Sequence, residues 1–198
     1  GKDEVGGSNP PNSSKSLENV VFSRLFVFPR TGTHCSHPGG YIFAYIVLKY
    51  AKNLDEYVTV TIDPVEGSSM YLKKGERFTV MELLQGLLLT SGNDAAVVLA
   101  NHVGGSIEGF VDLMNKEALK IGAKDTHFNN PSGLPDDHHW TTAYDMALIA
   151  KELLKYEEIL KYTSIYEAYL KKPDGSSTWM VNTNKLIRFY SGATGLKT

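Results

Sequence analysis

The sequence predicts a mixed α/β (α+β) fold, in which helices occupy the middle of the chain and strands lie toward both ends. Three observations support this. Residues 79–122 contain apolar segments with helix-capping signals, short β-prone segments precede and follow the helical middle, and 198 residues suffice for one domain with its own core.

The amino-terminal part divides into a tail and the start of a domain. Residues 1–19 are polar and rich in Gly, Ser, Asn and Pro, which predicts a flexible tail. Residues 20–28 are apolar and β-prone and predict a strand, whereas Gly and Pro break up residues 29–40. We therefore expect a single domain over residues 20–198.

The helical middle is predicted from start and stop signals. Thr79 and Glu82 have the spacing of a capping box, and Ser106 and Thr142 are suited to cap two later helices. Glycines end two of the helices. We expect helices over 41–50, from the capping box through Leu89, over 94–103, between Ser106 and Gly122, from Thr142 through Leu154 and over 157–162. Strands are expected over 57–62, 166–170 and 178–181.

Composition excludes several functional classes. Twenty basic and twenty-two acidic residues give a net charge of −2, which argues against a nucleic-acid binder with a broad basic surface. The chain has no apolar run long enough to span a bilayer, and no basic segment followed by an apolar one that would predict a signal peptide. The single cysteine, Cys35, excludes an internal disulfide.

A polar tripeptide, Ser91-Gly92-Asn93, separates two apolar helices. From spacing alone, the favoured interpretation is a helix–helix turn with Asn93 or Asp94 as the N-cap. The alternative is a functional corner that points a hydroxyl and an amide into a cleft. There the hydroxyl could relay a proton, and the amide could both donate to and accept from a peptide bond.

Beyond these local patterns, the chain resembles a known family over about residues 42–198. The likeness lies in collinear strings around Gly67-Ser68-Ser69, Leu87 to Ala96, Asp125 to Leu134, Thr142 to Ala147, Asn182 to Leu186 and Gly195 to Thr198. These strings resemble the serine D-alanyl-D-alanine carboxypeptidases, which are the low-molecular-mass penicillin-binding proteins. Ser-x-x-Lys, Ser-x-Asn and Lys-Thr-Gly carry catalysis in their superfamily.

The resemblance implies a β-lactamase/transpeptidase-like fold, with a helical cluster packed on an antiparallel sheet. It implies acyl transfer on peptidoglycan stem peptides that end in D-Ala-D-Ala, inhibition by β-lactams, and an extracytoplasmic location in a bacterium. By carry-over, Ser91 relays protons, Asn93 orients the substrate amide, Lys197 attracts the substrate carboxylate and Thr198 hydrogen-bonds it. No cofactor, metal or nucleic acid is expected.

The sequence departs from the family pattern at the nucleophile. No serine in the chain is followed three positions later by lysine, although the Ser hydroxyl needs such a base. Counting back along the chain brings the nucleophile near Ser36 or His37, but Gly39 or Gly40 stands where the lysine belongs. Residues 8–40 as a whole look foreign to the family, which leaves a shifted reading frame, an artefact or a degenerate copy as explanations.

A second departure lies at the end of the sequence. Thr198 is the last residue, so the glycine of Lys-Thr-Gly and the family's membrane anchor do not follow it. We therefore expect a fold that is incomplete at its carboxyl terminus and an impaired enzyme. The alternative function is a non-catalytic relic or fragment that binds peptidoglycan or a β-lactam.

Two histidine clusters suggest a competing hypothesis of metal-dependent hydrolysis. They are His34-Cys35-Ser36-His37 and Asp136-Asp137-His138-His139. Their residue types suit zinc, but their spacing matches no closed zinc pattern, so we expect no metal site.

Overall fold

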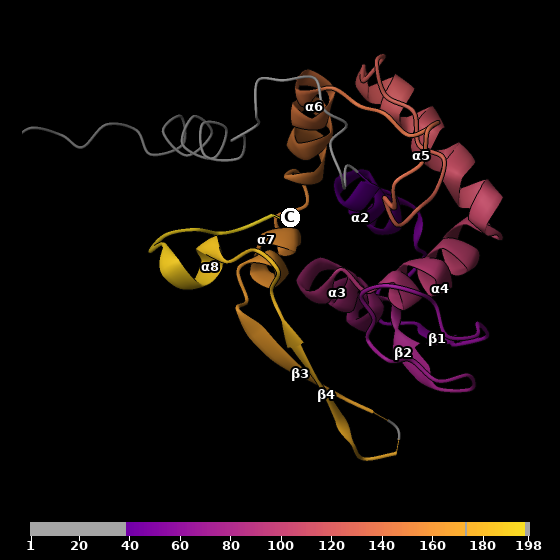
Figure 1. The fold of residues 1–198 in the computed structure, drawn as a ribbon, viewed down its shortest axis with the longest axis vertical. Coiled ribbons are helices and arrows are strands. Elements are labelled where there is room, and N and C mark those ends of the chain that lie inside the picture. Colours follow the sequence, from indigo (N-terminus) through magenta and orange to yellow (C-terminus); the bar gives the residue numbers. More distant parts are fainter. Residues whose placement is uncertain (1–38, 173, 197–198) are drawn as a thin grey trace, which may run out of the picture. The chain divides into compact units, whose positions relative to one another are not determined.

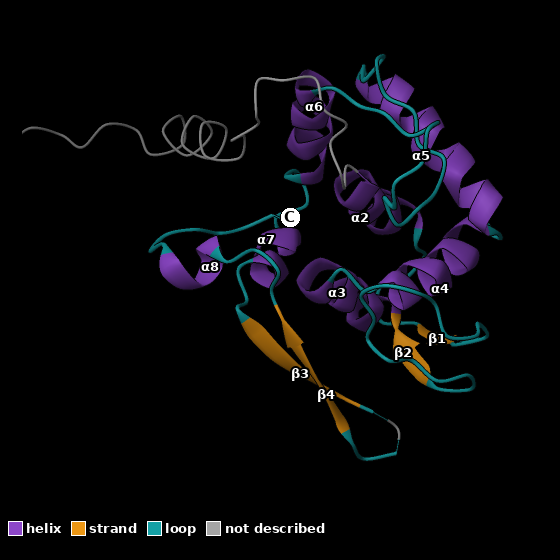
Figure 2. Ribbon diagram, viewed as in Figure 1, coloured by secondary structure: helices purple, strands orange, loops and turns teal. Residues whose placement is uncertain are grey.

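The computed structural model describes residues 39–172 and 174–196. Helices are the main regular elements of this part of the chain, and two antiparallel strand pairs supply its strands (Figure 1, Figure 2). The helices are α2 (Gly39–Tyr50), α3 (Val80–Thr90), α4 (Asn93–Gly104), α5 (Ile107–Ile121), α6 (Ala143–Leu153), α7 (Glu158–Thr163) and α8 (Leu186–Phe189). The strands are β1 (Tyr57–Thr59), β2 (Arg77–Thr79), β3 (Glu167–Lys171) and β4 (Ser177–Val181).

The helix starts follow the predicted caps. Thr79 and Glu82 form the full capping box at the start of α3, with each side chain bonded to the other's backbone amide. Ser106 and Thr142 accept backbone amides at the starts of α5 and α6. Gly122 ends α5 in the left-handed conformation, which glycine adopts at little cost. The tail over 1–19 and the strand over 20–28 lie outside the described residues.

The strands form two separate antiparallel pairs. β1 pairs with β2 through Val58 and Phe78, and β3 pairs with β4 through Tyr169 and Trp179. The strand predicted over 57–62 ends at Thr59, although backbone bonds at Val60 carry the pairing slightly further. Sequence patterns did not predict β2 or α8, each of which is only three or four residues long.

The core of this unit is built around α3. Helix α3 contacts α2, α4, α7, β2 and β4, and its valine and leucine side chains are almost fully buried. Phe43 on α2 packs on Phe110 of α5, with ring centroids 4.4 Å apart. Such central packing fixes both ends of α3, including the end at Thr90, where the predicted functional corner begins.

A buried ionic cluster joins α2 to α5. The Glu117 side chain of α5 is fully buried and accepts hydrogen bonds from Lys49, Tyr50 and Lys120. Burial alone would raise the pKa of Glu117, but the bonds from Lys120, Lys49 and Tyr50 outweigh it and lower that pKa to about 2. The carboxylate therefore stays charged inside the fold. None of the described helices is long and apolar enough to cross a membrane.

Candidate active site

The corner between α3 and α4 holds Ser91 in an uncommon conformation. Ser91 caps the carboxyl end of α3 with φ 56° and ψ 38°, in the left-handed region. For a residue other than glycine this costs about 1–3 kcal/mol and is found most often at functional sites. The Ser91 side chain is half-buried, and its hydroxyl makes no hydrogen bond to another described residue.

Asn93 is the first residue of α4, and its side chain is held by the preceding loop. Its Nδ2 donates to the Glu66 carbonyl at 2.9 Å, and its backbone amide donates to the Ser68 carbonyl at 2.7 Å. Since only the nitrogen of an amide can donate to a carbonyl, this bond fixes which way the side chain is turned. The Oδ1 atom and the second N–H remain for a peptide bond.

The capping role predicted for Asn93 or Asp94 is wrong. Gly92 is the N-cap of α4, and no side chain makes a capping bond there. Neither residue is free to cap, because the side chain of Asn93 is used for the Glu66 carbonyl and that of Asp94 for the loop before it.

Asp94 is a site residue that the sequence reasoning missed. It is 2% exposed and accepts hydrogen bonds from Ser69 Oγ and from the backbone amides of Met70, Leu72 and Ala95. A charged residue is almost never buried unless it is bonded in this way. Asp94 thereby ties residues 69–72 to α4. A carboxylate directly before the apolar run of residues 95–100 was the signal that could have revealed it.

A second chain segment lies against the end of α3. The backbone amide of Thr183 donates to the Leu89 carbonyl at 2.9 Å, two residues before Ser91. The neighbouring Asn184 donates from Nδ2 to the Leu196 carbonyl at 3.1 Å. The structure thus brings Leu196 beside the segment that borders the corner. The predicted Lys197 and Thr198 follow Leu196 and lie outside the described residues.

The start of α2 packs against the loop at residues 130–134, which belongs to one of the strings that carry the family resemblance. A Cβ atom on Gly39 would lie 3.2 Å from the Gly133 nitrogen, so the two backbones touch. The Asn130 side chain stabilises this loop, because its Oδ1 accepts hydrogen bonds from the backbone amides of Gly133 and Leu134. The candidate nucleophile Ser36 lies outside the described residues, so its role stays a prediction.

The second histidine cluster, residues 136–139, immediately precedes Trp140, which forms a strand-like bridge with His127. His127 and Trp140 pair across it, and His127 stacks on Trp140. His139 is 7% exposed, its ring nitrogens have no hydrogen-bond partner among the described residues, and burial lowers its pKa. Within residues 39–172 and 174–196, no three His, Cys, Asp or Glu side chains are placed to hold a metal ion. His34, Cys35 and His37 lie outside these residues.

Comparison with known families gives one match over most of the chain. A family model described as D-alanyl-D-alanine carboxypeptidase matches residues 45–198. The D-alanyl-D-alanine carboxypeptidase DacF of Bacillus subtilis is 52% identical over 132 residues, which cover 67% of this chain and 34% of that protein. DacB2 of Mycobacterium tuberculosis is 34% identical over 167 residues, covering 81% and 57%. The chain therefore spans about a third of the Bacillus subtilis protein.

Solved structures give the same result. The Streptomyces K15 DD-transpeptidase superposes with a TM-score of 0.76 at 29% identity, over 83% of this chain and 70% of the transpeptidase. The carboxypeptidase DacD of Francisella tularensis superposes with a TM-score of 0.78 at 26% identity, over 83% of this chain and 53% of DacD.

Proposed function

We propose a function from the premise that this chain belongs to the D-alanyl-D-alanine carboxypeptidase family. In this proposal, the Ser91–Asn93 corner recognises peptidoglycan stem peptides ending in D-Ala-D-Ala. The observation that carries the proposal is the corner itself. Ser91 is held in a left-handed conformation and its hydroxyl bonds to no residue that the structure describes, whereas the Glu66 carbonyl accepts a hydrogen bond that orients the Asn93 side-chain amide. Both features suit recognition of a peptide bond.

In this proposal the chemistry is acyl transfer, with each residue in the role that the family motif gives it. Asn93 holds the substrate amide through its free Oδ1 and N–H, and Ser91 relays a proton. Lys197 attracts the terminal carboxylate and Thr198 donates a hydrogen bond to it. β-Lactams bind at the same place, and the location is the extracytoplasmic side of a bacterial envelope, where these peptides occur.

The acyl-transfer step itself is proposed to be impaired. No serine of this chain has a lysine three residues later, so an attacking hydroxyl would lack its usual base. General-base assistance is worth about 10²–10⁴ in rate. The same sequence feature favours a second candidate function, a non-catalytic module that binds the peptide or a β-lactam without forming a covalent adduct.

Two measurements on the same sample separate these functions. Intact mass after incubation with a penicillin reports acylation, and peptide mapping identifies the acylated serine. Calorimetric titration with an acylated D-Ala-D-Ala peptide reports binding. Asn93→Ala should weaken the peptide affinity about tenfold, the value of one or two hydrogen bonds. Asn53→Ala is the matched control, because Asn53 is exposed and, among the described residues, its side chain bonds only the Asp55 amide.

Each outcome has a distinct meaning. Binding without an adduct supports the binding module, and binding with a slow adduct supports an impaired enzyme. A rapid adduct on Ser36 would show that the chain builds a working nucleophile, and would overturn the impairment. A folded chain that neither binds the peptide nor forms an adduct contradicts the whole proposal.

A further inference from the structure

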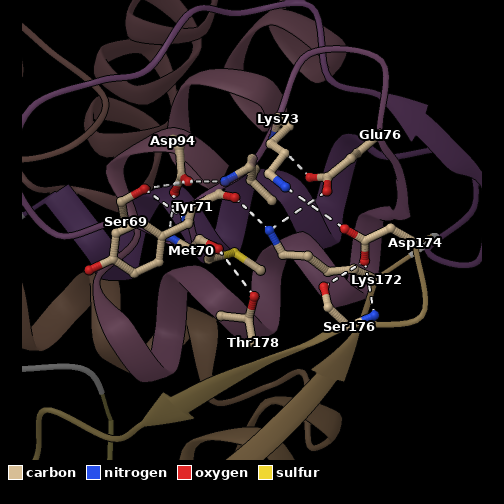
Figure 3. A network of polar contacts seen from close by, with 11 residues as sticks. Ser69, Met70, Tyr71, Lys73, Glu76, Asp94, Lys172, Asp174, Ser176 and Thr178 are labelled. Atoms are coloured by element: carbon tan, nitrogen blue, oxygen red, sulfur yellow. Dashed lines mark hydrogen bonds and ion pairs between the residues drawn. The ribbon is translucent and has the colours of Figure 1, made fainter.

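Hydrogen bonds and ion pairs link the β3–β4 hairpin to the loop over residues 66–76. The same loop accepts hydrogen bonds from Asn93. Figure 3 shows the polar side chains of the hairpin facing this loop. Thr178 Oγ1 donates to the Met70 carbonyl at 3.5 Å, and Lys73 lies 3.8 Å from Asp174. Lys172 makes the third and most buried link.

Lys172 is a nearly buried cation. Its side chain is 6% exposed, whereas its neighbour Lys171 is exposed. Its Nζ donates to the Tyr71 carbonyl at 2.5 Å and lies 3.7 Å from Glu76 Oε1. Burial of an ammonium group is costly unless it is paired and hydrogen-bonded, and here both partners belong to the loop. The position of this lysine is thus tied to the conformation of residues 71–76.

The loop has a strained residue at the point where Lys172 binds. Tyr71 has φ 58°, in the left-handed region, and the residue is 75% exposed. Its amide donates to Ser69 Oγ at 2.9 Å, and that hydroxyl donates to Asp94 at 2.6 Å. Such a conformation persists only where the surroundings hold it on several sides. Two groups hold Tyr71 in place (Figure 3). Asp94 on α4 acts through Ser69, and Lys172 on the hairpin bonds the Tyr71 carbonyl directly.

We propose that Lys172 is a positioning residue for Asn93. By holding the Tyr71 carbonyl from the hairpin, it keeps residues 66–71 in place, so that the carbonyls of Glu66 and Ser68 orient the side chain and backbone of Asn93. An effect of Lys172 on substrate binding rests on the proposed function of Asn93. Its effect on the orientation of the Asn93 amide does not.

Nuclear magnetic resonance of the ¹⁵N-labelled full chain tests the structural step. Lys172→Met keeps an unbranched side chain as far as Cε and removes the ammonium group. We expect the Asn93 side-chain amide signals to shift, and the amides of Asn93 and Tyr71 to exchange with solvent about tenfold faster, the effect of one hydrogen bond to a charged group. Lys171→Met is the matched control, and Lys172→Arg, which keeps the charge and donors, should restore most of the original signals.

Unchanged Asn93 signals in folded Lys172→Met, or equal changes in Lys171→Met, would overturn the proposal. If Lys172→Met does not fold, Glu76→Gln takes its place, since it weakens the ion pair and leaves Lys172 present. It must then move the same Asn93 and Tyr71 signals by a smaller amount, and unchanged signals would again overturn the proposal.

A double-mutant cycle on peptide affinity tests whether Lys172 acts through Asn93. Lys172→Met should weaken binding of the acylated D-Ala-D-Ala peptide severalfold in the original chain and have little effect in the Asn93→Ala background. A merely structural role gives equal losses in both backgrounds and overturns the inference. If the original chain does not bind the peptide, the proposed function fails, and the resonance experiment alone decides the positioning role.

Discussion

Gly67 sets how closely the loop approaches Asn93. It has φ +88°, and a Cβ atom there would lie 2.5 Å from Asn93 Nδ2. Gly67→Ala therefore combines backbone strain with a clash against the side chain that we assign to peptide recognition. We expect it to lower the free energy of unfolding by about 1–3 kcal/mol and to displace the Asn93 side-chain amide signals. Denaturant titration and nuclear magnetic resonance measure the two effects.

Gly75 offers a matched control in the same loop. Its φ is +91°, but a Cβ atom there meets nothing within 4 Å. Gly75→Ala should thus carry the backbone cost without the clash. If both variants displaced the Asn93 signals equally, the close approach of Gly67 would not be what orients Asn93.

At the scale of single residues, the sequence predicted which residues form the corner but only part of what they do. Ser91 and Asn93 could be selected because a polar tripeptide interrupts two apolar helices. The bonds that orient Asn93 come from Glu66 and Ser68, more than twenty residues earlier, and helix periodicity carries no information about such contacts. The contacts of Lys172 could not be predicted either, because a lysine near a turn is usually solvated.

At the scale of elements, the link between α2 and α5 should make stability depend on acid. The folded pKa of Glu117 is about 2, and the unfolded value is about 4.3. The unfolded chain therefore binds a proton more readily, so the stabilisation is complete above about pH 5 and is lost as the pH falls from there toward 2. We expect the free energy of unfolding to decline over this window.

Glu117→Gln should flatten that decline and lower the stability at pH 7 by about 1.5–3 kcal/mol, because a charge-assisted cluster is weakened. Urea titrations at a series of pH values measure both effects. Glu158→Gln, at an exposed position on α7, should leave the pH dependence unchanged. A Glu117→Gln variant with the original acid dependence would show that other carboxylates dominate it.

The accuracy of the element predictions followed the strength of the local signals. The capping box at Thr79 and the caps at Ser106 and Thr142 are determined by neighbouring residues, and all three were predicted correctly. Strand β2 could not be found in this way, because three residues give no periodicity and Arg77–Thr79 form a strand only through pairing with β1. The same holds for the four residues of α8.

At the scale of the whole described unit, the contacts of α3 predict one cooperative transition. Leu88 of α3 is 1% exposed, and α3 contacts both β4 and α2. The two tryptophans report on different regions: Trp179 lies on β4, and Trp140 lies in the bridge before α6, which packs on α2. If α3 couples these regions, each tryptophan should report the same unfolding midpoint.

The variants Trp140→Phe and Trp179→Phe leave one tryptophan each, so fluorescence during urea titration follows the two regions separately. Adding Leu88→Ala to each should lower both midpoints together, because truncation of a buried leucine costs about 2–5 kcal/mol. Leu119→Ala, at a side chain that is 62% exposed, should move neither midpoint by much. Two midpoints that separate when Leu88 is truncated would show that the hairpin and the helical cluster unfold independently. The positioning of Asn93 by Lys172 would then depend on a hairpin that can detach while the rest of the fold persists.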